Sequence, residues 1–298
     1  MKLKFWGTRG SVPTPGEHTV RYGGNTPCVE VRLDDNKLII LDAGTGIRAL
    51  GDELVANGKP INAFLLISHP HWDHTQGFPF FRPAFIAGNE FTIIGGESER
   101  VSLQKMISDL MNRIYFPLHL DELKAKINFR TVAEEEFKIF DATVKTIYVN
   151  HPSFSLGFRI TYKGKSFVYI SDIEPFDGTI ERIKRNLDSH IVAKYTETKG
   201  DPNQRVYDFV RDTDVLIHDT TYTPDEYDDH VGWGHSHYLF SINVAVQGMV
   251  KKLVLFHHDP AHSDRIVDDI TFKCREEIRS RKVQLECVAA AEGMEIEI

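Results

Sequence analysis

Cysteine is scarce in this sequence, and apolar runs of membrane length are missing. The chain has three cysteines in 298 residues, Cys28, Cys274 and Cys287. Their odd number and wide spacing match no zinc-knuckle or disulfide pattern, which excludes a small disulfide-stapled fold and favours a reducing cytoplasm. No apolar run approaches the roughly 18 residues of a membrane helix, and residues 1–7 lack the apolar segment of a secretory signal. We therefore expect a cytoplasmic protein with no membrane partner.

Positive charge is also in short supply. Lysine and arginine together number 35, against 43 aspartates and glutamates, and the formal net charge is −8. Broad nonspecific nucleic-acid binding is therefore disfavoured, because it depends on neutralising phosphates with cationic side chains. A small phosphate ester, or RNA held by a local patch, remains compatible with this balance. The chain is nevertheless rich enough in apolar residues, at 41% hydrophobic, to bury a large core.

Short apolar strands and amphipathic helices alternate along the chain. We expect strands near 2–6, 28–33, 37–41, 62–67, 91–94, 143–149, 157–162, 166–170, 214–217, 252–256, 283–288 and 294–298. We expect helices near 47–55, 102–113, 239–250 and 263–281. Strands followed by helices occur twice along the chain, and this pattern predicts two sheets packed face to face with helices outside. We expect residues 1–298 to form a single domain, with the polar segment 178–206 as an inserted lid or arm.

One segment concentrates residues that bind metals. His69, His71, Asp73 and His74 fall within six positions, directly after the apolar run 64–67, which the pattern predicts to be a buried strand. Imidazole nitrogen and carboxylate oxygen are ligands that suit zinc, manganese and iron. The alternative is a polar turn with one satisfied histidine, which explains a single histidine better than it explains this cluster. The segment therefore predicts a metal site.

Further residues of the same kinds follow other predicted strands. His151 comes after the strand at 143–149, Asp172 follows the strand at 166–170, and His257 follows the strand at 252–256. Any one of them alone is explained by an ordinary structural role. Their repetition at strand ends favours a shared site, which only the fold can assemble because the residues are far apart in sequence.

These residues resemble the signature of the metallo-β-lactamase superfamily, namely His-x-His-x-Asp-His followed downstream by His, Asp and His. Residues 42–46, Asp-Ala-Gly-Thr-Gly, are similar to the early Asp-x-Gly signature of that superfamily. Residues 6–13, 218–222 and 234–237 resemble segments of its ribonuclease Z and phosphodiesterase-like branch. The resemblance spans nearly the whole chain and implies an α/β fold, a four-layer αββα sandwich, with a two-metal site at one sheet edge.

The resemblance also implies a set of ligands for two divalent metal ions. The first metal is expected on His69, His71 and His151, and the second on Asp73, His74 and His257, with Asp172 bridging both. His257 is preferred to His258 because it directly follows the strand. Zinc is the expected metal, with manganese and iron as alternatives.

The chemistry that the resemblance implies is hydrolysis by a hydroxide that bridges the two metals. Asp73 is expected to orient this nucleophile as well as to bind metal. His235 is expected to donate a proton to the leaving group, with Asp219 as its orienting carboxylate. The sequence has Asp219 where the branch has Glu and His237 where it has Thr, so which of His235 and His237 faces the substrate stays open.

Two further groups of residues have less distinctive patterns. One follows the histidine cluster and either rims a pocket or belongs to the core: Phe78, Phe80, Phe81 and Phe85. The other either contacts phosphate at the mouth of the site or forms turns: Thr8, Arg9, Ser11, Asn25 and Thr26.

The leading functional hypothesis is a metal-dependent phosphodiesterase that acts on a small or cyclic phosphodiester, or on RNA. The segment around His235 favours it over the alternative, a hydrolase of carboxylic esters, thioesters or lactones with the same dinuclear site. A third hypothesis, a non-catalytic binding protein, is disfavoured by the complete ligand set. No counterpart of the glycine-rich basic arm with which ribonuclease Z grips transfer RNA is evident, which argues against that substrate. The resembling branch also makes a homodimer an expected assembly.

Overall fold

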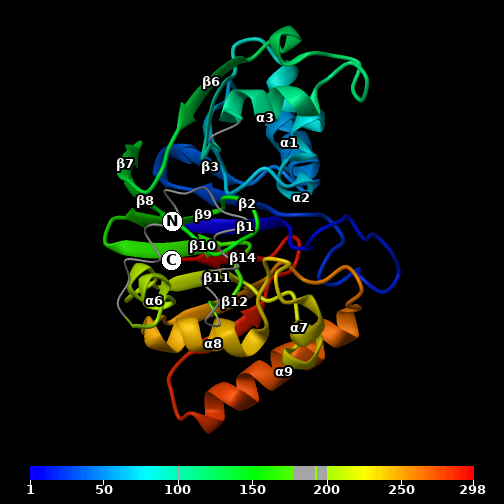
Figure 1. Ribbon diagram of the computed structural model, residues 1–298. Helices are drawn as coiled ribbons and strands as arrows, with labels where there is room; N and C mark the ends of the chain where they lie inside the picture. Colours follow the sequence, from blue (N-terminus) through cyan, green and yellow to red (C-terminus); the bar gives the residue numbers. More distant parts are fainter. Residues whose placement is uncertain (99–100, 177–191, 193–199) are drawn as a thin grey trace.

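The computed structural model describes residues 1–98, 101–176, 192 and 200–298. It contains a first seven-stranded sheet with the strand order β14-β1-β2-β3-β4-β5-β6. Its strands are β1 (Lys2–Gly7), β2 (Cys28–Arg32), β3 (Leu38–Leu41), β4 (Asn62–Ile67), β5 (Glu90–Gly95), β6 (Lys126–Thr131) and β14 (Glu295–Glu297). The two ends of the chain lie side by side, because β14 pairs with β1 and the Ile298 amide donates to the Met1 carbonyl at 2.9 Å (Figure 1).

The second sheet also has seven strands, in the order β13-β12-β11-β10-β9-β8-β7. Its strands are β7 (Glu136–Ile139), β8 (Ala142–Tyr148), β9 (Leu156–Tyr162), β10 (Lys165–Ile170), β11 (Val215–Asp219), β12 (Lys252–Phe256) and β13 (Glu286–Ala289). Strands β10 to β13 run parallel, as do β3 to β6 in the first sheet. Because the carboxyl ends of parallel strands meet at one edge, residues that follow these strands are brought together.

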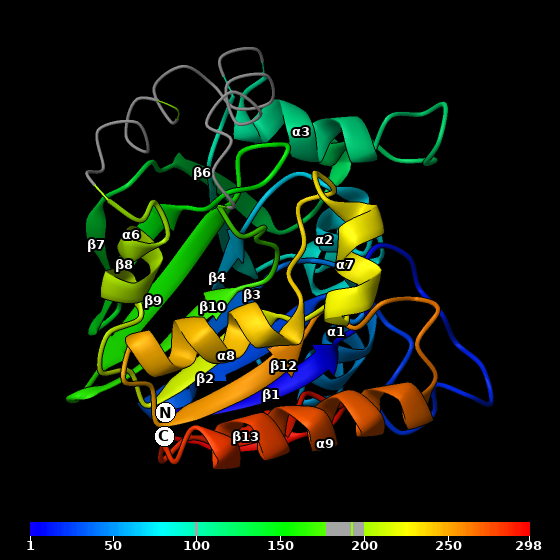
Figure 2. The same cartoon turned by 60° about the horizontal axis from the view of Figure 1, so that its bottom comes forward.

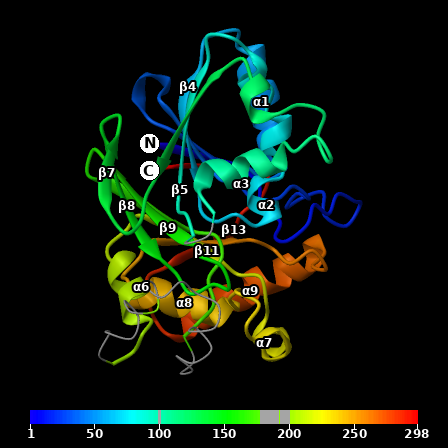
Figure 3. The same cartoon turned by 45° about the horizontal axis from the view of Figure 1, so that its top comes forward.

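Helices cover the outer faces of both sheets. The first sheet carries α1 (Ile47–Ala56) and α3 (Leu103–Leu110), and the second carries α6 (Gln204–Phe209), α8 (Tyr238–Gln247) and α9 (Asp264–Ser280). Figure 1 shows α1 and α3 on one side of the paired sheets and α8 and α9 on the other, and Figures 2 and 3 show the same layers from other angles. The predicted αββα sandwich is therefore confirmed.

Shorter helices occupy the connections. These are α2 (Trp72–Thr75), α7 (Pro224–His230) and the 3-10 turns Asp34–Asn36, Phe78–Phe80, Arg82–Phe85 and Leu120–Glu122. Both α2 and α7 lie on the same side of the molecule (Figures 1 and 2). No helix among the described residues combines the length and the apolar character that crossing a membrane requires.

Apolar side chains fill the three interfaces between the four layers. Between the sheets, Phe256 packs against Phe5 with ring centroids 6.0 Å apart and against Tyr169 at 5.7 Å. The interior strand β4 is buried on both faces, because a sheet covers one face and helices cover the other. Burial on both faces explains why β4 reads as a continuous apolar run.

Most predicted elements appear close to their expected positions, and the strands at 62–67 and 252–256 match residue for residue. The prediction missed β6, β7, α2, α6 and α7, and the helix expected at 102–113 ends at Leu110. Residues 178–191 and 193–199 of the expected lid or arm at 178–206 lie outside the described residues, and α6 begins within its last three positions.

Candidate metal centre

The residues that the sequence singled out meet at one edge of the sandwich. They follow the carboxyl ends of strands from both sheets: the 69–74 segment follows β4, and the other three positions follow β8, β10 and β12. Two groups result, each with one ligand atom per residue and all of these atoms within 4.8 Å of one another. One group is His69, His71, His151 and Asp172, and the other is Asp73, His74, Asp172 and His257. The structure thus brings all seven side chains together.

Asp172 belongs to both groups, and each of its oxygens faces a different one. Its Oδ2 lies 3.6 Å from Nε2 of His69. Its Oδ1 lies 3.1 Å from Nε2 of His74 and 3.4 Å from Nε2 of His257. A buried carboxylate in this position suits a bridge between two cations.

The surrounding atoms fix how the imidazoles point. Four of them have an oxygen near Nδ1: Ser68 Oγ at 3.0 Å from His69, Asp42 Oδ2 at 2.8 Å from His74, the Gly234 carbonyl at 3.0 Å from His151, and Thr221 Oγ1 at 3.1 Å from His257. Contacts of this kind set the tautomer and ring orientation of metal-binding histidines. They leave the Nε2 atoms directed into the cluster. His71 differs, since its Nδ1 faces Nε2 of His151 at 3.2 Å.

Burial holds the histidines of the first group neutral. Desolvation lowers the pKa of His69 well below its ordinary value and lowers the pKa of His71, and it lowers the pKa of His151 to about 3. A neutral imidazole keeps a free lone pair, which is the state that binds a metal ion.

The second group holds opposite charges at close range. Burial opposes ionisation of Asp73 and Asp172, but the nearby imidazoles outweigh it and hold the pKa of both carboxyls well below the ordinary range. Burial also opposes the charging of His74, yet the surrounding carboxylates, with Asp172 first, raise its pKa well above the ordinary value. The carboxylates therefore draw positive charge into the cluster, and a bound cation would supply that charge while leaving His74 neutral.

Two buried atoms provide a test of whether a cation fits. Within the described part of the chain, Nε2 of His69 and Oδ1 of Asp172 have no hydrogen-bond partner, although the latter has imidazole nitrogens close by. Leaving a buried polar atom unpaired costs free energy. One divalent cation in each group would satisfy them, the first at Nε2 of His69 and the second at Oδ1 of Asp172, and imidazole nitrogen with carboxylate oxygen is a donor set suited to such ions. The cluster therefore fits divalent metal ions.

The second part of the site is a histidine–carboxylate pair beside the cluster. His235 Nδ1 lies 3.1 Å from Oδ2 of Asp219, and its ring stacks on His257 at 4.9 Å. The Ile173 and Thr221 amides donate to the two oxygens of Asp219 at 3.1 and 3.0 Å. Burial lowers the pKa of His235, but attraction and hydrogen bonding from Asp219, helped by other carboxylates, outweigh it and raise the pKa to about 9. Asp219 therefore reaches the His235 imidazole, although its side chain is shorter than the glutamate of the resembling branch.

The geometry resolves two alternatives that the sequence left open. His237 lies outside the cluster, at the start of α8, with its ring 4.9 Å from that of Tyr227. His258 is also turned away, since its Nε2 lies 2.9 Å from the Ala290 carbonyl. His235 and His257 are therefore the members of the two pairs that face the site.

Arg9 does not contact a phosphate site, so that alternative of the sequence analysis is wrong. Its side chain is fully buried. The guanidinium donates to the carbonyls of Asp259 and His262 at 2.9 and 2.7 Å and to that of Gly23 at 3.2 Å. The arginine therefore ties backbone segments together, which is the turn role.

The other polar residues of the same group divide between structure and site. Thr8 and Thr26 are buried, and the Asn25 side chain donates to Glu292 at 3.0 Å. Ser11 alone reaches the cluster, where its amide donates to Oδ2 of Asp73 at 2.8 Å.

The phenylalanines after the cluster mostly belong to the core. Phe78 and Phe81 are buried under α1, and Phe85 packs against the same apolar cluster. Phe80 is exposed and contacts Phe116 edge to face at 5.5 Å.

Several supporting residues were missed by the sequence analysis. Asp42, which directly follows β3, accepts hydrogen bonds from the Ser68 amide and the Tyr169 hydroxyl, both at 2.7 Å, and also contacts His74. Its place in the Asp-x-Gly signature was the available signal. Thr221 sits in a segment that was noted only for its resemblance, and Glu174, which binds the loop before His235, had no signal.

Three of the ten non-glycine residues that have positive φ in the described part of the chain lie at the site. Ser11, Asp42 and His257 have left-handed φ values of 60°, 59° and 61°, which cost free energy for residues other than glycine and occur most at functional sites. Gly234 has φ of 90°, and a Cβ at this position would overlap with the imidazole of His151. Only glycine therefore allows the loop before His235 to approach the cluster so closely.

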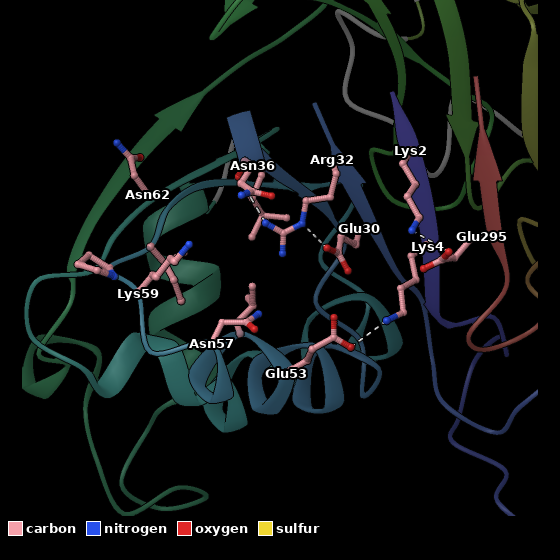
Figure 4. A pocket seen from close by; sticks show the side chains of 14 residues that line it. Lys2, Lys4, Glu30, Arg32, Asn36, Glu53, Asn57, Lys59, Asn62 and Glu295 are labelled. Carbon is pink, nitrogen blue, oxygen red and sulfur yellow. Dashed lines mark hydrogen bonds and ion pairs between the residues drawn. The ribbon is translucent and has the colours of Figure 1, made fainter. Parts of the chain in front are cut away.

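A pocket at the opposite end of the first sheet has a different character. Figure 4 shows it lined by charged side chains that pair with one another, such as Lys2 with Glu295 at 2.7 Å and Lys4 with Glu53 at 2.8 Å. Strand β4 begins at this pocket with Asn62, whereas the cluster follows its other end. The paired charges satisfy each other, so the chemistry is concentrated at the histidine cluster.

Paired mixed sheets between helical layers, with imidazoles and carboxylates gathered where the strands end, are typical of metal-dependent hydrolases with the metallo-β-lactamase fold, and this protein is of that class. The chain belongs to the Beta-lactamase superfamily domain family, whose sequence model matches residues 37–258. The predicted superfamily is thereby confirmed.

Individual relatives point to the same branch as the sequence did. A ribonuclease Z from Thermoplasma acidophilum is 25% identical over 300 residues, covering 90% of this chain and 89% of that protein. Among solved structures, the metallo-β-lactamase fold protein YhfI from Bacillus subtilis has a TM-score of 0.68 at 17% identity, covering 100% of this chain and 98% of that one. The short form of human tRNase Z has a TM-score of 0.64 at 20% identity, covering 100% and 99%.

Proposed function

We propose that this protein is a metal-dependent phosphodiesterase whose substrate is RNA or a small or cyclic phosphodiester. The observation that carries the proposal is the His235–Asp219 pair, held at 3.1 Å and stacked against the cluster through His257. A positioned acid beside a metal centre suits a leaving alkoxide, which needs a proton. The relatives named ribonuclease Z support RNA as one substrate class.

The seven clustered residues would hold two divalent cations. We assign His69, His71 and His151 to one cation, Asp73, His74 and His257 to the other, and Asp172 to both. When bound, such ions lower the pKa of a shared water molecule and neutralise charge on a phosphoryl oxygen. Zinc is our first choice, with manganese or iron as alternatives, because nitrogen and oxygen donors accept all three.

The other residues of the chain orient groups and move a proton. Asp219 holds Nδ1 of His235, so that Nε2 is the atom that donates a proton to the leaving oxygen. Asp73 has one oxygen fixed by the Ser11 amide, which limits how its carboxylate can turn as it orients the nucleophile. The Gly234 carbonyl contacts His151, and this contact fixes the position of His235 relative to the cluster.

We place the protein in a reducing compartment such as the cytoplasm, as one domain over residues 1–298 that assembles as a homodimer. The unpaired, buried state of all three cysteines supports the compartment. Pairing of β14 with β1, at opposite ends of the sequence, supports the single domain. The homodimer rests on the resemblance, and sedimentation analysis tests it.

The direct test uses purified protein loaded with zinc or manganese. Bis(p-nitrophenyl) phosphate and a short oligoribonucleotide should be hydrolysed, and a chelator should abolish both activities. His69→Ala should lose metal and activity, whereas His18→Ala, which alters an exposed histidine far from the cluster residues in sequence, should keep both. Rapid hydrolysis of lactones or thioesters with no turnover of either phosphodiester would show that the alternative ester hydrolase is correct. Protein that binds no metal would revive the non-catalytic hypothesis.

A further inference from the structure

Two exposed tryptophans adjoin the metal centre. Trp72 is 78% exposed and Trp233 is 62% exposed. Trp72 stands between His71 and Asp73 in the sequence, and Trp233 is two residues before His235. Scattered exposed apolar residues are ordinary, but these two large aromatic side chains belong to the segments that supply residues of the site.

Each tryptophan is next in the sequence to a residue at or near the open edge of the cluster. His71 is the solvent-exposed member of its group, while the other members are buried, so the cluster opens to solvent there. Nδ1 of His71 lies 3.2 Å from Nε2 of His151, whose Nδ1 lies 3.0 Å from the Gly234 carbonyl. His151 therefore links His71, which Trp72 follows, to Gly234, which Trp233 precedes.

The backbone that carries Trp233 is held rigidly. The buried Glu174 carboxylate accepts hydrogen bonds from the amides of Gly232 and Gly234, the latter at 3.1 Å. The ring of His230 contacts Trp233 edge to face at 4.8 Å and stacks on Tyr222 at 4.5 Å. An aromatic side chain that is already ordered loses little conformational entropy when a ligand binds it.

Trp72 is fixed by its neighbours in a different way. It opens the short helix α2, and its carbonyl accepts from the Gln76 amide at 2.6 Å. The residues before and after it both belong to the cluster. Its backbone position is thus set by the geometry of the metal centre.

We infer that Trp72 and Trp233 bind a nucleobase of the substrate by stacking, which makes the substrate a phosphodiester that carries an unpaired base. This inference rests on the phosphodiesterase function proposed above. Every base has a π face that an aromatic side chain can stack on, and this mode of recognition tolerates different base sequences. Stacking also suits an acidic protein whose Arg9 is committed to backbone carbonyls, because it needs no cationic surface.

The test compares two esters with the same leaving group. Thymidine 5′-(p-nitrophenyl phosphate) carries a base, and methyl p-nitrophenyl phosphate does not. Trp72→Ala and Trp233→Ala should each raise KM for the thymidine ester by roughly 5- to 150-fold, with kcat retained and with kcat/KM for the methyl ester unchanged. Trp→Phe at either position should retain most of the effect, because phenylalanine also stacks.

A matched control and a binding measurement separate stacking from a loss of structure. Phe272→Ala removes an aromatic ring that is 64% exposed on α9, and it should leave both esters unaffected. Isothermal titration calorimetry should show that thymidine 5′-monophosphate binds the metal-loaded wild-type protein, and that it binds the double variant at least roughly fivefold more weakly. This readout does not depend on turnover.

The outcomes distinguish the inference from the function on which it rests. If the metal-loaded wild type hydrolyses neither ester, the proposed function fails. If it hydrolyses both without preference for the thymidine ester, or if the tryptophan variants behave like wild type, the stacking role is wrong. A shift from dimer to monomer in the tryptophan variants, with KM unchanged, would show that Trp72 and Trp233 form a subunit contact, and it would also contradict the stacking role. Cleavage of a single-stranded oligoribonucleotide but not its duplex assigns the base to RNA, and cleavage of the thymidine ester alone assigns it to a small molecule.

Discussion

His235 has the surroundings of a proton donor, yet it also sits with Asp219 and His257 in a group whose atoms could hold a metal. The two roles make different predictions for His235→Ala. As a proton donor, its loss should lower kcat by roughly 100- to 10,000-fold for a dinucleoside monophosphate, whose leaving group is an alkoxide. It should have little effect on bis(p-nitrophenyl) phosphate, whose leaving group departs without a proton. Equal losses on both substrates, together with a lower metal content, would show that His235 is a ligand.

The ionisation of His235 predicts the alkaline limb of the pH profile. Its pKa is raised from 6.5 to about 9, mainly by Asp219 acting against burial. Bound cations would oppose the further contributions of Asp172 and Asp73. The protonated acid is lost as pH rises, so kcat for an alkoxide leaving group should fall with a midpoint between roughly 6.5 and 9. Measurement of kcat from pH 5 to 10 checks this, and the same limb in His235→Ala would contradict it.

Single residues also show what local sequence can and cannot specify. The residues of the cluster were recognisable because imidazole and carboxylate groups follow apolar strands, and the structure gathers them at one edge. The role of Arg9 stayed undecided between a phosphate contact and a turn, because a guanidinium near glycines looks the same in sequence whether it faces a phosphate or three carbonyls. Its partners lie as far away as His262, and nothing near Arg9 in the sequence identifies them.

At the scale of elements, α7 carries a start signal that the sequence analysis passed over. Thr223 caps the helix by accepting from the Glu226 amide, Glu226 accepts in return from the Thr223 amide, and Pro224 occupies the first turn. Such a capping box with proline is a recognised helix start. By contrast β7 is only four residues long at the edge of its sheet, and so short a pattern is not distinctive.

The cap of α7 can be tested directly. Thr223→Ala should lower the free energy of unfolding by about 0.5–2 kcal/mol, because the first-turn amide loses its acceptor. Denaturant unfolding measures the change. Ser102→Ala, at the corresponding position of α3, is the matched control and should show a loss of similar size. An unchanged midpoint in Thr223→Ala alone would show that tertiary contacts hold α7 in place without its cap.

At the scale of the whole molecule, the sandwich was predictable because strands and helices alternate and because the motif resembles a known superfamily. The pairing of the last strand with the first was not predictable from the sequence, since the register of Lys2 with Glu297 depends on contacts between opposite ends of the chain. The residues of the cluster are also far apart in the sequence, from His69 to His257, and they come from both sheets.

Removal of metal should therefore weaken the protein as a whole. Ions that bind only the folded state stabilise it by about 2.7 kcal/mol when free metal is a hundredfold above its Kd. For a chain of this size, a chelator should lower Tm by roughly 5–10 °C, and added zinc, manganese or iron should restore it in the order of affinity. Differential scanning fluorimetry measures the shift. A Tm that the chelator leaves unchanged would contradict metal binding at the cluster.

Because both sheets contribute residues to the cluster, the amount of this protein in a cell should depend on how much of the native metal the cell contains. Without a cation, buried carboxylates from the two sheets face each other across the interface, and the fraction of opened molecules available to proteases rises. Changes of one or two kcal/mol alter steady-state abundance several-fold. A cell that lacks the native metal should therefore contain less of the protein. Immunoblots should show this lower amount of polypeptide, which adds to the loss of activity in the molecules that remain.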